Sequence, residues 1–208
     1  VGKGGGGGLV VQAVLVEEAF DRRSDPHPYP SPQGGGGLSW TWRFLMTTLT
    51  TPRLVLRPPQ DADRTALVAG LDNLNVSRWT GRIPHPYGPD DAEAFLNHVR
   101  QTPQDALVLV ITHEGALIGV IGIEGGELGY WLAEPHWGKG YGTEATGSIV
   151  KWGRANLPDG ACACIISPDN AASVALARKL GFTPDGTASY AGDTVMLMRL
   201  RLRDELRT

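Results

Sequence analysis

The chain has 208 residues, ordinary apolar content and a formal net charge of −3. That length fits one substantial domain with a tail better than two very small domains. The near-neutral charge excludes a global field that would hold nucleic acid at physiological salt, so a small, locally charged substrate fits better. No apolar run reaches the roughly 18 to 20 residues that span a bilayer. No secretory cleavage pattern follows the early apolar run, so we expect a soluble, cytoplasmic protein with no membrane partner.

Residues 1–45 differ in composition from the rest of the chain. They contain two glycine runs and a proline-rich stretch from Pro26 to Pro32, and such a composition cannot bury a core. Met46 stands just ahead of the first strand-like segment. We therefore interpret residues 1–45 as an extension, either translated upstream sequence or a disordered tail, and residues 46–208 as the folded domain.

The folded region opens with a predicted strand, Thr51–Arg57. Asp61 can cap a helix that runs to about Leu71, and Asp90 with Glu93 three residues later forms a capping-box-like start of a second helix. Three apolar runs separated by short glycine-containing turns then predict an antiparallel meander, at 106–112, 116–124 and 127–133.

The second half of the chain alternates helical and strand patterns. A helix is predicted over about 143–156, and a crossover leads to a strand over 161–167. Asp169 or Asn170 caps a further helix that ends at Gly181, and two last strands cover about 182–190 and 194–202. The whole pattern predicts an α/β or α+β domain with a mixed, mostly antiparallel central sheet and helices on its faces.

The two cysteines, Cys162 and Cys164, lie in the apolar strand over 161–167. Residues two apart share one face of a strand, with Cα atoms near the upper limit for a disulfide. No histidine or acidic spacing nearby suggests a metal site. We therefore expect two buried core thiols, no disulfide and no metal.

The strongest chemical signal is Gly138-Lys139-Gly140-Tyr141-Gly142, between an apolar strand and an amphipathic helix. Glycine lets the backbone approach a ligand, and the helix start presents N–H groups and a positive dipole end. The segment predicts an anion site for two phosphates, to which Lys139 adds charge; a loop that only turns the chain is the alternative. It is not a P-loop, because no Gly-Lys-Ser/Thr ends it, and it does not follow the first strand as a dinucleotide fold requires.

Five ordered blocks resemble the GNAT acetyltransferases, and within them the branch of RimJ/RimL-type ribosomal-protein N-terminal acetyltransferases, over roughly residues 50–203. They are Thr51–Arg57, Pro84-His85-Pro86-Tyr87 with Asp91–Phe95, Glu127–Leu132, Trp137–Ala145, and Asn170–Ser173 with Lys179–Phe182. The resemblance implies a sheet splayed open for acetyl-CoA, with helices on both faces. It also implies an N-acetyltransferase that moves acetyl from acetyl-CoA to a primary amine by direct attack in a ternary complex. The alternative is a non-catalytic acyl-CoA-binding sensor.

The resemblance assigns expected roles to individual residues. Backbone groups near Leu132 and Ala133 would pair with pantetheine, and an N–H there would stabilise the oxyanion. Glu127 is the first candidate proton acceptor and Glu124 the second, against a reading of both as solvated turn carboxylates. The cofactor-binding set is Leu132, Ala133, Trp137, Gly138, Lys139, Gly140, Tyr141, Gly142, Thr143 and Asn170, the last of which is also a candidate helix cap.

Ser173 is the expected donor to the departing thiolate, because Ala177 stands where many GNAT members have a tyrosine; a plain first-turn serine is the alternative. Trp79, Arg82 and Tyr87 are expected to line the acceptor entrance, where His85 could equally be a surface histidine. The acceptor would be a small-molecule amine or a peptide N-terminus, and the protein a monomer or homodimer.

Overall fold

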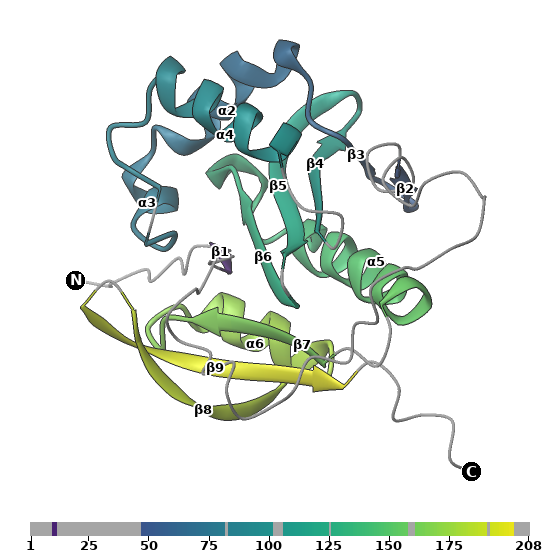
Figure 1. Ribbon diagram of the computed structural model, residues 1–208, viewed down its shortest axis with the longest axis vertical. Coiled ribbons are helices and arrows are strands. Elements are labelled where there is room, and N and C mark those ends of the chain that lie inside the picture. The colour runs from purple at the N-terminus through teal and green to yellow at the C-terminus, as the bar shows by residue number, and fades with distance from the viewer. Residues whose placement is uncertain are drawn as a thin grey trace, which may run out of the picture.

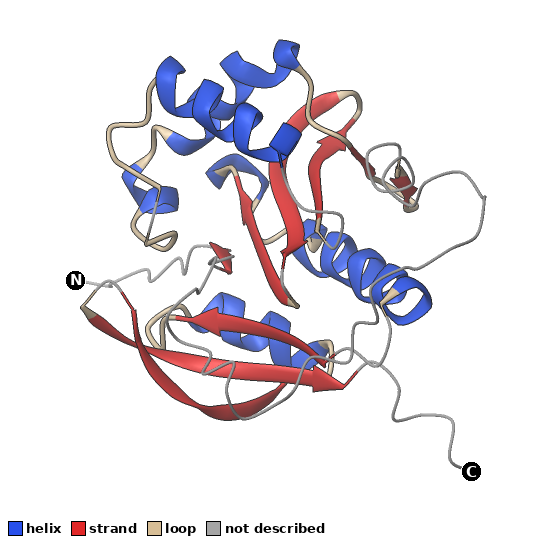
Figure 2. Cartoon of the chain, viewed as in Figure 1, coloured by secondary structure: helices blue, strands red, loops and turns tan. Residues whose placement is uncertain are grey.

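The fold consists of one splayed β-sheet with helices on both faces (Figures 1 and 2). A computed structural model describes residues 10–11, 47–81, 83–101, 106–124, 126–157, 161–190 and 192–201. The strands are β1 Val10–Val11, β2 Leu49–Thr50, β3 Val55–Arg57, β4 Leu107–His113, β5 Ala116–Glu124, β6 Glu127–Leu132, β7 Ala161–Ile166, β8 Thr183–Tyr190 and β9 Asp193–Arg201. The helices are η1 Asp61–Asp63, α2 Arg64–Leu71, α3 Leu74–Ser77, α4 Pro89–Gln101, η2 Glu134–His136, α5 Tyr141–Asn156 and α6 Ala171–Lys179.

The sheet has the strand order β2-β3-β4-β5-β6-β7-β9-β8, and β1 adds to β6 outside this path. All neighbours are antiparallel except β6 and β7, which pair in parallel through a single position, Glu127 opposite Ala163. Beyond that position the two strands separate, and Figure 1 shows β1 in the gap between them. The predicted mixed, mostly antiparallel and splayed sheet is therefore confirmed.

Apolar side chains on the two faces of the sheet form separate clusters. Helices α2, α3 and α4 cover one face, where Leu67, Leu96 and Trp131 belong to one buried cluster. Helix α5 and helix α6 cover the other face, where Ile149 and Leu176 belong to the second. The alternation of side chains along β6 explains the division, because Trp131 points to the first layer while Leu132 points to the second.

Strand and helix positions agree with the periodicity, with boundaries mostly shifted by one or two residues. The predicted opening strand is wrong in extent, because a bend after Thr51, closed by its N–H bond to the Leu54 carbonyl at 2.9 Å, separates β2 from β3. The second helix begins earlier than predicted. Its capping carboxylate is Asp91, which accepts the Gly88 N–H at 2.8 Å, and not the Asp90–Glu93 pair.

Most of the expected extension, residues 1–45, lies outside the described residues, and only β1 belongs to it. In the part of the chain that the structure describes, no helix has the length and hydropathy of a membrane span.

Candidate active site

The glycine loop after β6 leads directly into helix α5. Gly138 and Gly140 have φ angles of 71° and 82°, a conformation that favours glycine. Gly140 is the residue before α5 and supplies no capping side chain. The first N–H groups of the helix, which lack acceptors inside any helix, therefore point out of its end. The sequence predicts an anion site at this position.

A cavity of about 260 Å³ lies between this loop and α6. Backbone of Gly138, Gly140 and Gly142 borders it on one side, and the Lys179 side chain belongs to the other wall. N–H donors, a positive helix end and a lysine suit a pyrophosphate. The residues present thus fit the phosphate end of acetyl-CoA.

A carboxylate network fixes the loop to the start of the domain. Glu144, in the first turn of α5, accepts hydrogen bonds from the Thr51 hydroxyl at 2.6 Å, the Arg53 N–H at 2.9 Å and Arg53 Nε at 2.7 Å. Arg53 Nη1 in turn donates to the Lys139 carbonyl at 3.0 Å, and its guanidinium lies 4.6 Å from the Tyr141 ring centre. Burial alone would raise the pKa of Glu144, but the hydrogen bonds from Thr51 and Arg53 outweigh it and lower that pKa.

Sequence reasoning missed this network, although Arg53 and Glu144 both stand in blocks that carry the resemblance to the GNAT acetyltransferases. Tyr141 adds a second anchor, because its hydroxyl lies 3.0 Å from His113 Nε2 at the end of β4. Partial burial, together with the charges of Lys139 and His113, lowers the pKa of the neighbouring His136.

The gap between β6 and β7 is lined by backbone groups of β6. Ala133 donates its N–H to the Ile118 carbonyl of β5 at 2.9 Å. Because antiparallel strands alternate the direction of these groups, the N–H and carbonyl groups of Tyr130 and Leu132 point away from β5 and into the gap. The expectation for Leu132 fits this geometry, whereas the N–H of Ala133 is already used inside the sheet.

Two elements already occupy part of this edge. The Trp137 indole donates to the Leu132 carbonyl at 2.7 Å, so Trp137 links the loop to the gap. Strand β1 pairs with β6 through Val10 opposite Trp131 and Val11 opposite Tyr130. β1 therefore lies where an extended pantetheine arm would pair.

Helix α6 places a buried hydroxyl beside this gap. Asn170 caps the helix by accepting the Ser173 N–H at 3.2 Å, which confirms its predicted capping role. Ser173 is buried. Burial raises the pKa of Tyr130 on β6 well above its ordinary value, while the neighbouring Ser173 side chain acts in the opposite direction. Ser173 thus lies near a tyrosine that sequence reasoning did not select.

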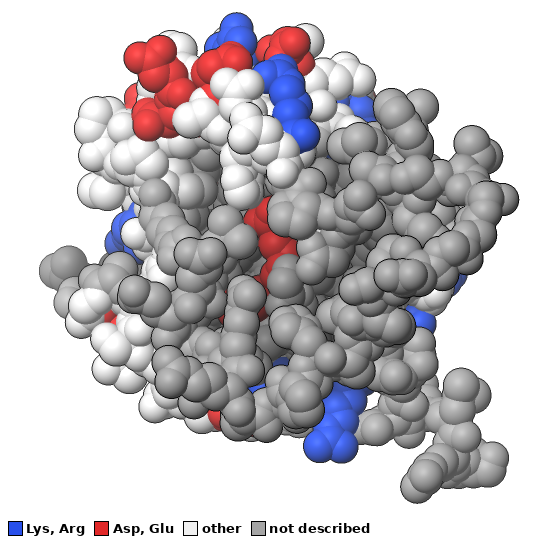
Figure 3. Space-filling view, viewed as in Figure 1, with Lys and Arg blue, Asp and Glu red and all other residues white. Residues whose placement is uncertain are grey.

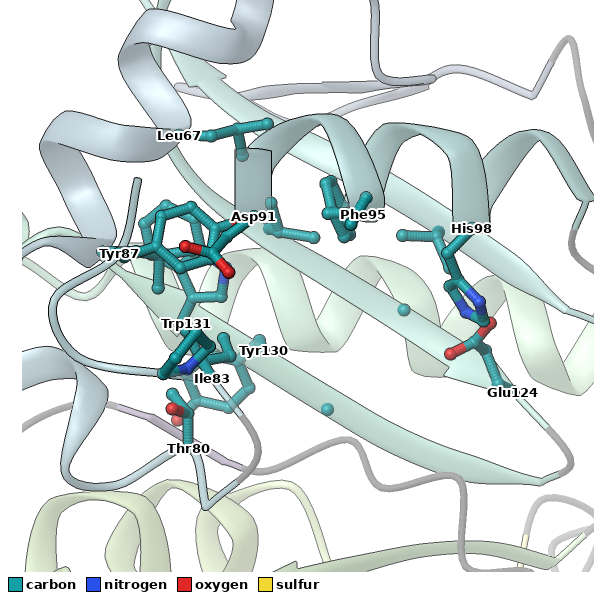
Figure 4. Close-up of a pocket in the computed structure, with 17 residues that line it drawn as sticks. Leu67, Thr80, Ile83, Tyr87, Asp91, Phe95, His98, Glu124, Tyr130 and Trp131 are labelled. Carbon is teal, nitrogen blue, oxygen red and sulfur yellow. The ribbon is translucent and has the colours of Figure 1, made fainter. Parts of the chain in front are cut away.

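A larger cavity of about 440 Å³ lies between the sheet and the α2–α4 layer (Figure 4). Tyr87, predicted for the acceptor side, lines this cavity with Phe95 and Trp131. Trp79 packs against the same apolar cluster but is not part of the lining. Arg82 lies outside the described residues.

His85 is not part of the cavity lining. It lies on the surface, with Nδ1 3.6 Å from an Asp72 oxygen.

Carboxylates gather at one end of the cavity. Glu124 lines it and stands directly opposite Glu127 across the two-residue turn between β5 and β6. His98 on α4 places Nε2 3.2 Å from Glu124 Oε1. Glu127 is half-buried, and its Oε2 atom is buried, so this carboxylate is only partly solvated.

The prediction of two buried core thiols is confirmed, since Cys162 and Cys164 are buried and free. Burial, with a smaller effect from the charge of Glu127, raises the pKa of Cys162 to about 12. Burial also raises the pKa of Cys164. Both thiols are therefore protonated at neutral pH and poor nucleophiles.

Comparison with known proteins identifies the family. The model of the acetyltransferase (GNAT) domain matches residues 53–183. The chain is 29% identical over 150 residues to the uncharacterized N-acetyltransferase YoaA of Bacillus subtilis, covering 66% of this chain and 84% of that protein. An acetyltransferase from Agrobacterium tumefaciens has a TM-score of 0.60 and 28% identity, covering 81% of this chain and 99% of that chain.

The fold also matches that of RimL, a ribosomal L7/L12 alpha-N-protein acetyltransferase in complex with coenzyme A. That comparison has a TM-score of 0.63 at 18% identity and covers 74% of this chain and 98% of RimL. The chain belongs to the GNAT acetyltransferase family, whose general reaction is acetyl-CoA-dependent acetyl transfer.

Proposed function

We propose that the protein transfers acetyl from acetyl-CoA to a primary amine within a ternary complex. The observation that carries this proposal is the position of β6 between two sites. The gap toward β7 and the glycine loop lie along one edge of β6, and the 440 Å³ cavity lies over one of its faces. Two substrates bound in these places meet at the middle of β6, so no covalent enzyme intermediate is needed.

The loop residues Gly138 to Thr143 hold the pyrophosphate of acetyl-CoA in this proposal. The N–H groups of Tyr130 and Leu132, which face the gap, replace that of Ala133 as candidate donors to the thioester oxygen. Such donors lower the barrier of acyl transfer by about 3 kcal/mol in well-studied enzymes. The amine nitrogen attacks the thioester carbon, and the carbon–sulfur bond breaks as the tetrahedral species collapses.

Glu127 accepts the proton that the attacking nitrogen loses, directly or through water. Its buried oxygen lies where β6 and β7 begin to separate, on the side of the cavity. Glu124, directly across the turn, is the second candidate. Because a neutral amine is the nucleophile, the rate depends on a deprotonated carboxylate that can accept the proton of the amine.

Ser173 donates a hydrogen bond to the departing thiolate. The support is its buried position in the first turn of α6, near Tyr130, whose raised pKa keeps the phenol protonated. A thiol with an ordinary pKa leaves with little assistance, so this contribution is modest.

A sensor that binds acyl-CoA without transfer is the second candidate. It is favoured by Ala177, which stands in place of the usual tyrosine. Such a sensor binds CoA but releases no thiol with any amine.

Initial rates of thiol release with acetyl-CoA and amine both varied test the proposal. A ternary complex predicts intersecting double-reciprocal lines, whereas parallel lines indicate a covalent intermediate and contradict it. Glu127→Gln should lower kcat by about 100-fold. Glu114→Gln, in the exposed turn after β4, is the matched control and should leave kcat unchanged.

A further inference from the structure

We infer that the cavity under α4 selects a primary amine carried on an apolar body. The ammonium end would lie at Glu124 and Glu127, and the hydrocarbon would extend toward Tyr87 and Trp131. This inference rests on the proposed function and names its acceptor class.

At the far end of the cavity, polar side chains form hydrogen bonds within the protein. Asp91 is held by the Gly88 N–H at 2.8 Å, and the Thr80 hydroxyl donates to the Ser77 carbonyl at 2.6 Å. Burial, with a smaller effect from the charge of Asp91, raises the pKa of Tyr87 to about 12, so the phenol is neutral. Internal hydrogen bonds thus engage polar groups at this end, and the aromatic rings of Tyr87 and Trp131 dominate it (Figure 4).

The opposite end is acidic. Glu124 lines the cavity, and Glu127 is its direct cross-strand neighbour; like charges in that relation repel each other. A bound ammonium relieves that repulsion. Arg100, the arginine of α4, forms ion pairs with Asp61 and Glu93, not with Glu124.

Figure 3 shows acidic atoms in the hollow at the centre of the face it displays, below the charged side chains of the α2–α4 layer. His98 borders the acidic end, and its side chain is 42% exposed. The acidic end of the cavity therefore includes a histidine that contacts Glu124.

Two glycines form the floor between these ends. Gly122 of β5 and Gly129 of β6 stand directly opposite each other, and both line the cavity. Phe95 of α4 lines the same cavity. A Cβ atom on Gly122 would lie 2.9 Å from the Leu107 carbonyl oxygen, so the floor there cannot be raised without moving backbone.

This floor sets the dimensions of the bound acceptor. From Trp131 to Glu127 the strand spans about 13 Å at 3.3 Å per residue. A flat, apolar slot of that length suits an unbranched alkyl chain or an aromatic ring bearing an aminoalkyl group. Gly129 belongs to β6, whose edge faces the gap toward β7. An amine above Gly129 is therefore beside the proposed thioester position.

The same chemistry has two sources, a free amine or a peptide N-terminus with an apolar first side chain. The experiment measures kcat/KM for thiol release by the full chain with unbranched amines from ethylamine to octylamine. A second arm uses short peptides that begin with leucine or serine. We expect kcat/KM to rise about fourfold for each added methylene until the slot is filled. Activity with the leucine peptide but not with the amines identifies the peptide source.

A flat or falling series, with ethanolamine or spermidine as the better acceptor, overturns the inference but leaves the proposed transferase intact. Absence of thiol release with every acceptor tested contradicts the transferase. Calorimetry of hexylamine with the CoA-bound protein then separates the two failures, since binding without turnover supports the slot, and absence of binding overturns the inference as well.

Variants of α4 test the location. Ala94 lines the cavity, so Ala94→Trp narrows the slot. This variant should lower the hexylamine-to-ethylamine ratio of kcat/KM at least about tenfold, which corresponds to the loss of contact with nearly two methylene groups. Asn97→Trp, on the same helix outside the lining, is the matched control and should retain the ratio. Equal ratios in both variants and the wild type would place the hydrocarbon elsewhere and overturn the inference.

Discussion

Replacing Glu144 by alanine should destabilise the fold and weaken CoA binding together, because one carboxylate joins the glycine loop to the first strands. Its hydrogen bond from Thr51 is partly buried, and a bond of that kind to a charged group contributes about 1.5 kcal/mol. The Arg53 side chain is 45% exposed, so solvent screening limits its contribution to about 0.5 to 1 kcal/mol. The sum is about 2 kcal/mol, or a fall in Tm of about 4 to 8 °C for a domain of this size.

The binding effect follows from the second contact of Arg53. Without Glu144 the guanidinium is no longer oriented toward the Lys139 carbonyl, and the loop loses an anchor worth about one hydrogen bond. The dissociation constant for CoA should therefore rise about tenfold. Urea denaturation and calorimetric titration with CoA measure the two effects. Glu93→Ala, which removes the partner of Arg64 far from the loop, is the control and should leave CoA affinity unchanged.

The pH dependence supplies an independent check. The pKa of Glu144 is lower in the folded than in the unfolded protein. Its contribution is therefore present above the unfolded value, near 4.5, and is lost as pH falls through the folded value. Wild type and Glu144→Ala should differ at neutral pH and converge in acid. A stability difference that persists unchanged in acid, or a destabilised variant with normal CoA affinity, would refute the reasoning.

Three further predictions concern the cofactor side of the site. Gly138→Ala and Gly140→Ala should each lower stability by about 1 to 2 kcal/mol, because φ is positive at both. Gly140→Ala should weaken CoA binding more in calorimetry, since a Cβ there meets a guanidinium at 3.4 Å while Gly138 has open space; equal affinities would contradict this. Val11→Pro removes an N–H that β1 can offer to β6 and should tighten CoA binding several-fold, and unchanged affinity would show that β1 does not compete. Cys162 and Cys164 should resist iodoacetamide at pH 8 and react only in denaturant, whereas rapid labelling of the native protein would contradict their burial.

Local patterns determine most of the strands and helices here, but not the short helix α3 or the break between β2 and β3. The meander follows from apolar runs separated by short glycine turns, and α5 and α6 follow from periodicity with identifiable ends. The short helix α3 was not predicted, because four residues, Leu74–Ser77, carry no periodic signal. The break between β2 and β3 depends on the Thr51 turn and on Glu144, which is 93 residues away.

The residues of the candidate site also fall into those that a local pattern identifies and those that it does not. The glycine loop and the opposed pair Glu124 and Glu127 are encoded by nearby residues, so the sequence alone identified them as candidates. The His98 contact with Glu124 and the Arg53 bond to Glu144 join residues 26 and 91 positions apart. Such contacts depend on how α4 and α5 pack on the sheet, which no local pattern specifies.

The most direct test of acetyl transfer at this site is thiol release from acetyl-CoA by the purified full chain with hexylamine as acceptor, with mass spectrometry of the product. Transfer with Glu127 as proton acceptor predicts release that requires both substrates, yields N-acetylhexylamine and falls about 100-fold in Glu127→Gln. CoA binding without thiol release from any amine or peptide would contradict it and establish the sensor instead.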